Sequence, residues 1–192
     1  MYKEYAQVTF PEFTGAKVNM MPFVFGDLKT IPEYLQQYID IINQCNFEKG
    51  TVCYLTVHES VVKNTTQRRG GVHVEAPNLL SWGGGAWGGM SPNKGVYMAS
   101  TDGACQVWDE IVTDRDHHGA CEPLGEPEKM KPNTLYWMTD KTPHQALESN
   151  GKRQFIRIVS SEISLWFKQH NTKNPLGIEP TCEIVEWNKF KV

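Results

Sequence analysis

Short runs rich in β-branched and aromatic residues, separated by turn signals, constrain the fold of this chain more than any other feature. Glycine, proline and asparagine interrupt the sequence at 91–95 (SPNKG), within 119–133 and at 149–152 (SNGK). Runs of this length and composition are typical of strands, and the glycine, proline and asparagine residues between them are typical of turns. The predicted strands lie at 51–58, 71–76, 95–100, 104–112, 134–139 and 153–160.

The segment 32–45 has the periodicity of a helix instead. Thr30 is its predicted N-cap, and Glu33 stands three residues later, as in a capping box. Apolar residues at three- and four-residue spacing form one stripe, which predicts that the helix packs against the strands. The stripe consists of Ile31, Leu35, Tyr38, Ile39 and Ile42.

A second short helix is predicted at 164–170 and a further strand at 182–192. A helix followed by six or more short strands is typical of a β-sandwich or barrel with helical buttressing. The sequence has no fixed-period repeat and no linker-like stretch, so we expect a mainly β protein in which 1–192 form a single domain.

Charge and hydropathy argue against several classes of protein. The chain has 19 Lys and Arg against 22 Asp and Glu, a net charge of −3, which is unlike a general nucleic-acid binder. No run approaches the roughly 18 apolar residues of a membrane-spanning helix. The first residues, MYKEYAQVTF, lack the apolar core of a signal peptide. We therefore expect a cytoplasmic protein without nucleic-acid or membrane partners, of unspecified oligomeric state.

The cysteines indicate neither a disulfide framework nor a structural zinc site. Their number is odd, at five, and no two stand at CxxC spacing. We interpret them as mostly buried thiols.

His73 and Glu75 are the first residues that could carry chemistry. They stand two apart in the predicted strand 71–76, and the period of a strand places both side chains on one face. An imidazole and a carboxylate that project together make a suitable pair of ligands for a divalent metal ion.

His144 is the candidate for a third ligand. It follows the strand-like run 134–139 and Pro143, which restricts the backbone just before it. Two histidines and one carboxylate with open positions form the facial triad that suits non-haem Fe(II). The sequence thus predicts a metal site made of His73, Glu75 and His144.

Two arginines follow the distal histidine in the predicted strand 153–160. Arg153 and Arg157 are four residues apart, so they share one face, with Phe155 between them. Either guanidinium could hold a carboxylate in fork geometry.

The order His-x-Glu, several strands, His and then Arg resembles the Fe(II)/2-oxoglutarate-dependent oxygenases. The resemblance covers about 51–161 and implies a double-stranded β-helix, or jelly roll, with one or two helices packed outside. Glu75 stands where most members have Asp. The family's anchoring arginine lies about ten residues past the histidine; Arg153 is nine past His144 and Arg157 thirteen, and we prefer Arg157.

The resemblance also implies an activity. His73, Glu75 and His144 would hold Fe(II), and Arg157 or Arg153 would bind 2-oxoglutarate. The expected reaction is oxidation, by default hydroxylation, of a small molecule or an exposed side chain. Aromatic residues that could line the cavity are Tyr97, Trp108, Tyr136 and Trp137, and strand alternation lets only one of Tyr136 and Trp137 face inwards.

Three other segments carry alternative readings. His117 and His118, with Asp114 and Asp116, could form a rival metal cluster in a loop or be solvated. Arg68 and Arg69 could hold an anionic substrate at the mouth of the site, or form a solvated loop. The segment 81–90 (SWGGGAWGGM) could close over a ligand or cap the core.

Two further functions remain open on the sequence alone. One is a cupin-like metalloenzyme that needs no 2-oxo acid, in which His58 or His118 would join His73 and His144. The other is a non-catalytic jelly roll that binds a sugar or a protein through 81–90. A fold does not decide among these functions.

Overall fold

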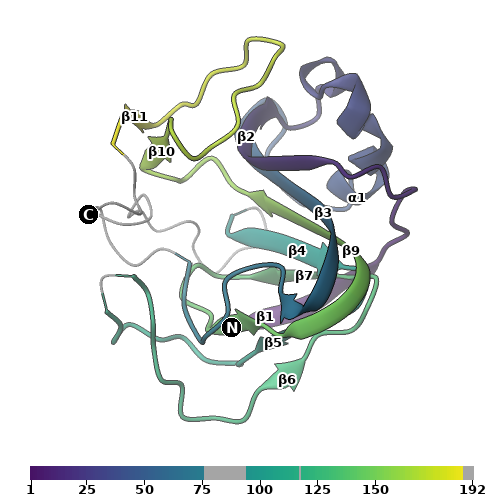
Figure 1. Ribbon diagram of the computed structural model, residues 1–192. Helices are drawn as coiled ribbons and strands as arrows, with labels where there is room; N and C mark the ends of the chain where they lie inside the picture. The colour runs from purple at the N-terminus through teal and green to yellow at the C-terminus, as the bar shows by residue number, and fades with distance from the viewer. Residues whose placement is uncertain (76–93, 117, 188–192) are drawn as a thin grey trace.

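Antiparallel sheets make up most of the computed structural model, which describes residues 1–75, 94–116 and 118–187 (Figure 1). The largest sheet has six strands, in the order β1 (Tyr2–Gln7), β7 (Thr134–Met138), β4 (Val96–Ser100), β9 (Glu148–Val159), β3 (Val52–Thr66) and β2 (Lys17–Val24). A second sheet has the order β6 (Glu128–Lys129), β5 (Cys105–Val107) and β8 (His144–Ala146). The prediction of a mainly β protein is confirmed.

A small parallel pair, β10 (Leu165–Phe167) and β11 (Glu183–Val185), completes the strands of the described ranges. The helix predicted at 164–170 is therefore wrong. Leu165, Trp166 and Phe167 are all buried, and the Trp166 indole donates to the carbonyl of Met20 at 2.8 Å. Tertiary burial thus selects an extended backbone. Only Glu183–Val185 of the strand predicted at 182–192 forms, and 188–192 lie outside the described residues.

The predicted 32–45 helix is replaced by shorter pieces. A 3-10 turn, η1 (Leu28–Thr30), precedes the 3-10 helix η2 (Glu33–Tyr38), which continues into the single α-helical turn α1 (Ile39–Ile42). Asp27, not Thr30, caps the first turn, because its carboxylate accepts from the Lys29 amide at 3.0 Å. The Thr30 hydroxyl instead donates to the Asp27 carbonyl. Of the apolar stripe, Ile31, Leu35, Tyr38 and Ile42 are buried as expected, and Ile39 is partly buried.

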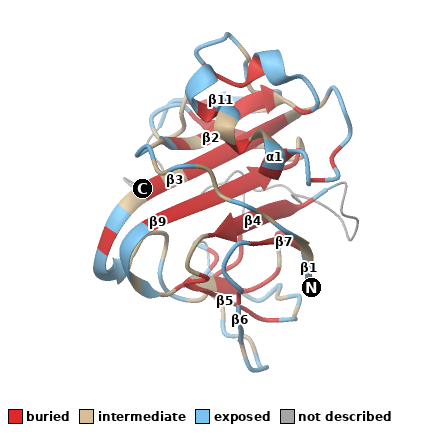
Figure 2. Ribbon diagram, turned by 90° about the vertical axis from the view of Figure 1, so that its right-hand side faces the viewer, coloured by how far each residue is buried: buried red, intermediate tan, exposed pale blue. Residues whose placement is uncertain are grey.

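Both faces of the six-stranded sheet are covered, as the buried strands in Figure 2 show. Alternate residues of a strand point to opposite faces. One face packs on the helical segment, and it includes Tyr97, Trp137 and Ile156. The other face packs on β5 and Trp166, and it includes Met98, Tyr136 and Phe155. Because β5 belongs to the smaller sheet, a core lies between the two sheets.

Several predicted strands form, but with different bounds. The strands at 95–100 and 134–139 are confirmed within one residue as β4 and β7. The strands at 51–58 and 153–160 correspond to the mostly buried parts of the much longer β3 and β9, which pair from Tyr54 to Thr66 along the whole of β9. The strand at 104–112 shortens to β5.

The strand predicted at 71–76 is wrong as a regular element. His73 forms single bridges with Ala120 and His144. The next two amides then bond to different segments: Val74 donates to Gly119, and Glu75 to Asp140. No one neighbouring strand is therefore available to continue a ladder.

Sequence reasoning missed β1 and β2. In the sequence, Pro22 interrupts the strand pattern of β2. In the structure, Met20 has a positive φ of 47°, which is unusual for a strand. Both features are tolerated there because β2 is an edge strand with a register shift between Val18 and Met21.

The cysteines are free thiols, and Cys45, Cys53 and Cys105 are buried, as predicted for most of the set. No membrane-spanning helix occurs in the ranges that the structure describes.

Candidate metal centre

His73 and His144 are far apart in the sequence, but they pair with each other in an isolated antiparallel β-bridge. The amide of His73 donates to the carbonyl of His144 at 3.0 Å, and the amide of His144 donates to the carbonyl of His73 at 3.0 Å. Both side chains are buried, and their ring centroids are 4.6 Å apart. His144 lies on β8 and His73 is paired with His144, so β8 fixes the position of both imidazole rings.

The two rings are oriented in the same way by their own backbone. The Nδ1 atom of His73 lies 2.7 Å from the Gly71 carbonyl, and that of His144 lies 3.0 Å from the Thr142 carbonyl. Because a carbonyl can only accept, each Nδ1 carries a proton. A neutral ring protonated at Nδ1 presents the lone pair of Nε2, which is the form that binds a metal.

Glu75 completes the cluster. The bond from its amide to the Asp140 carbonyl at 2.9 Å holds this segment against the chain just before β8. Its Oε1 lies 3.3 Å from the Nε2 of His144. One ligand atom from each of His73, Glu75 and His144 lies within 4.8 Å of the others, and all three residues are buried. The structure thus brings the three predicted ligands together.

Arg157 on β9 contacts the same carboxylate. Its Nη1 donates to Oε1 of Glu75 at 2.6 Å and to Oε2 at 2.8 Å. Burial alone would raise the pKa of Glu75, but the Arg157 guanidinium lowers it well below its usual value. The carboxylate is therefore ionised, as a metal ligand must be.

The buried position of His73 also favours its ligand form. Burial and the neighbouring His144 lower the pKa of His73 from 6.5 to about 3. The ring is thus neutral at physiological pH, when it can donate its lone pair.

Arg153, the other candidate anchor, is engaged elsewhere. Its Nε donates to Asp102 at 2.8 Å, and its Nη2 donates to the Ala104 carbonyl at 3.3 Å. Arg153 shares a face with Arg157 and Phe155, as predicted, but it does not line the pocket at the cluster. The two arginines therefore have different partners: Arg157 is paired with Glu75, and Arg153 is paired with Asp102.

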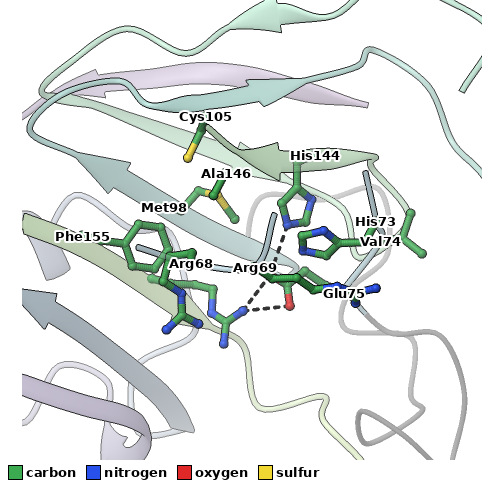
Figure 3. A pocket seen from close by; sticks show the side chains of 11 residues that line it. Arg68, Arg69, His73, Val74, Glu75, Met98, Cys105, His144, Ala146 and Phe155 are labelled. Carbon is green, nitrogen blue, oxygen red and sulfur yellow. Dashed lines mark hydrogen bonds and ion pairs between the residues drawn. The ribbon is translucent and has the colours of Figure 1, made fainter. Parts of the chain in front are cut away.

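A small pocket opens beside the cluster (Figure 3). Its polar wall combines the three candidate ligands with three arginines, and its apolar wall comes from β4, β5, β8, β9 and Val74. The lining residues are Arg68, Arg69, His73, Val74, Glu75, Met98, Cys105, His144, Ala146, Phe155 and Arg157.

The donor set fits a divalent transition metal. Two imidazole nitrogens and one carboxylate oxygen suit iron, and they are too few and too nitrogen-rich for a calcium site. The Oε2 of Glu75 can stay with Arg157 while Oε1 faces the histidines, so the ion pair and a metal are compatible. Among the described residues, this is the single group of three or more metal-ligating side chains.

The rival cluster does not form among the described residues. Asp116 accepts from the amides of His118 and Ala120 at 2.8 Å each, which makes it a turn residue. His117 and the segment 81–90 lie outside the described residues.

The expected aromatic lining is wrong. Tyr97 and Trp137 belong to the helix-side core, and neither Tyr136 nor Trp108 reaches the pocket. Among the residues that the structure describes, Phe155 is the aromatic side chain that lines the pocket. The position of Phe155 between Arg153 and Arg157 was the sequence feature that could have identified it as a pocket residue.

Comparisons of the chain with protein-family models, with curated proteins and with solved structures found no match. The function is therefore argued from the site.

Proposed function

We propose that this protein is a non-haem Fe(II) enzyme that uses 2-oxoglutarate to oxidise a small anionic or polar molecule. The observation that carries the proposal is the convergence of His73, Glu75 and His144, whose ligand atoms lie within 4.8 Å of one another in a pocket-lining, buried cluster. Three protein ligands leave positions for a bound co-substrate and dioxygen.

The architecture supports the same proposal. The ligands lie where the smaller sheet, through β8, approaches β9 of the larger sheet. A site between two antiparallel sheets is the arrangement expected of a jelly roll, and we propose that fold for the chain.

Each residue of the site has a definable role. The backbone carbonyls of Gly71 and Thr142 hold the imidazoles in the ligand tautomer. Arg157 orients Glu75 and keeps it ionised. The Nε–H of Arg157 is buried without an acceptor in the described part of the chain, so this guanidinium retains a donor for a carboxylate of the co-substrate.

When bound, iron would supply oxidation of a C–H bond by dioxygen. For hydroxylation the balance is one substrate, one dioxygen and one 2-oxoglutarate converted into one alcohol, one succinate and one carbon dioxide. The apolar wall of Met98, Ala146 and Phe155 would limit the access of bulk water during this reaction.

The test is metal content followed by turnover. The protein is purified without chelator, bound metals are measured, and succinate formation from 2-oxoglutarate is followed with added Fe(II). We expect close to one iron per chain and slow succinate formation without substrate. The H144A variant should lose both, because two ligands rarely retain the ion.

H118A is the matched control, since His118 is exposed and belongs to the rival cluster. It should bind iron as the natural protein does. Equal metal binding by H144A and the natural protein would contradict the proposed site.

A cupin-like metalloenzyme that needs no 2-oxo acid is the second candidate. It is favoured by the engagement of Arg157 with Glu75 and of Arg153 with Asp102. The extra histidine that it was expected to use is not supplied, because neither His58 nor His118 joins the cluster. Iron binding without any succinate formation would favour this candidate.

A further inference from the structure

Arg68 is a pocket cation without an acceptor. It lines the pocket and lies over the ring of Phe155, 5.2 Å from the centroid (Figure 3). No hydrogen bond or ion pair joins it to any residue in the described ranges. Arg153 and Arg157 beside it are paired with Asp102 and Glu75, respectively.

The surroundings of Arg68 leave positive charge uncompensated. Burial and the repulsion of Arg157 outweigh the attraction of Glu75, which is already paired with Arg157, and lower the pKa of Arg68 from 12.5 to about 10, so the side chain is still charged at neutral pH. A half-buried cation next to other cations is costly unless an anion joins it. A bound divalent metal would add further positive charge.

The wall near Arg68 suits a carbon skeleton. The Arg68 guanidinium stacks on the ring of Phe155, and the Arg153 guanidinium lies 6.0 Å from the centroid of the same ring. Stacking on the ring holds the Arg68 fork in place, which favours planar, two-point binding of a carboxylate. Met98 and Ala146 provide apolar contact for the methylene groups of a ligand.

We propose that Arg68 forms an anion subsite that binds a carboxylate of a small ligand in this pocket, separate from the Glu75–Arg157 pair. The identity of the ligand as substrate or co-substrate rests on the proposed function, whereas the subsite itself does not. The carboxylate comes from the substrate or from the distal end of the 2-oxo acid, and the experiment distinguishes these sources.

The first measurement is calorimetric titration of the metal-free protein with glutarate, for the natural protein and for R68Q. We expect R68Q to bind glutarate roughly tenfold to a hundredfold more weakly, because a charge-assisted contact is lost. R68K should retain part of the affinity. R115Q, which changes an arginine away from the pocket, is the matched control and should bind as the natural protein does.

The second measurement identifies the source. The metal-loaded natural protein and R68Q are titrated with 2-oxoglutarate and with 2-oxopentanoate, which lacks the distal carboxylate. A preference for 2-oxoglutarate that disappears in R68Q assigns the subsite to the co-substrate. A preference that survives in R68Q, with glutarate binding still dependent on Arg68, assigns it to the substrate.

Failure of the inference is distinct from failure of the proposed function. Glutarate binding that is absent in the natural protein, or equal in R68Q, overturns the subsite even if iron binds. Loss of iron binding overturns the proposed function while leaving the glutarate result unaffected.

Discussion

At the scale of single residues, Glu59 shows how a buried charge can be held by a dedicated set of partners. Glu59 on β3 accepts from three successive amides, those of Thr14, Gly15 and Ala16, at 2.5–3.0 Å. Tyr38 and Gln154 donate to its other oxygen. Glu59 thereby ties the loop before β2 and the end of η2 to the large sheet.

We expect E59Q to lower the free energy of unfolding by about 2–4 kcal/mol at neutral pH, because an amide cannot accept from all these donors. Burial alone would raise the pKa of Glu59, but the donors lower it below 4.5. The loss should therefore be full above the unfolded-state pKa and shrink as the pH falls through the folded-state pKa. Urea denaturation at pH 7 and pH 4 measures both effects.

E12Q is the control, because Glu12 is exposed. Its stability should match that of the natural protein within about 0.5 kcal/mol. An E59Q variant as stable as E12Q would show that the network contributes little.

At the scale of elements, burial of aromatic residues decides the backbone where local propensity is weak. The segment 164–170 has helical spacing but forms β10, because Trp166 is 1% exposed and anchors to the Met20 carbonyl. In β9, the shared face of Arg153, Phe155 and Arg157 was readable from the sequence. The irregular path of 71–75 was not, since its partners come from distant segments.

W166F should destabilise the protein by about 1–3 kcal/mol, because the Met20 carbonyl loses its donor and the core loses volume. Chemical denaturation measures the change. W187F is the matched control, since Trp187 is 36% exposed, and it should cost less than half as much. Equal losses in both variants would refute the anchoring role of Trp166.

At the scale of the whole molecule, the candidate metal centre joins segments that are far apart in the sequence. His144 lies on β8 of the smaller sheet, Glu75 on a loop, and Arg157 on β9 of the larger sheet. A metal bound by His73, Glu75 and His144 would therefore stabilise the folded state and not the unfolded chain.

Fe(II) or a redox-inert substitute such as Mn²⁺, at a hundredfold excess over its dissociation constant, should stabilise the protein by about 2.7 kcal/mol. At roughly 2–4 °C per kcal/mol, this corresponds to a rise in Tm of about 5–10 °C, measured by calorimetry before and after chelation. H73A should show no rise. A shift of the same size in H73A would mean that the metal stabilises the protein at another site.

The sequence by itself determined that the chain is mainly β, that Arg153, Phe155 and Arg157 share a face, and which three residues were candidate ligands. These follow from strand periodicity and residue chemistry, which are local. Only the tertiary structure decided that 71–75 is irregular, that Arg157 binds Glu75 and Arg153 binds Asp102, and that Arg68 is left without an acceptor. Such pairings depend on which segments meet in space, and no local pattern encodes the distance between them.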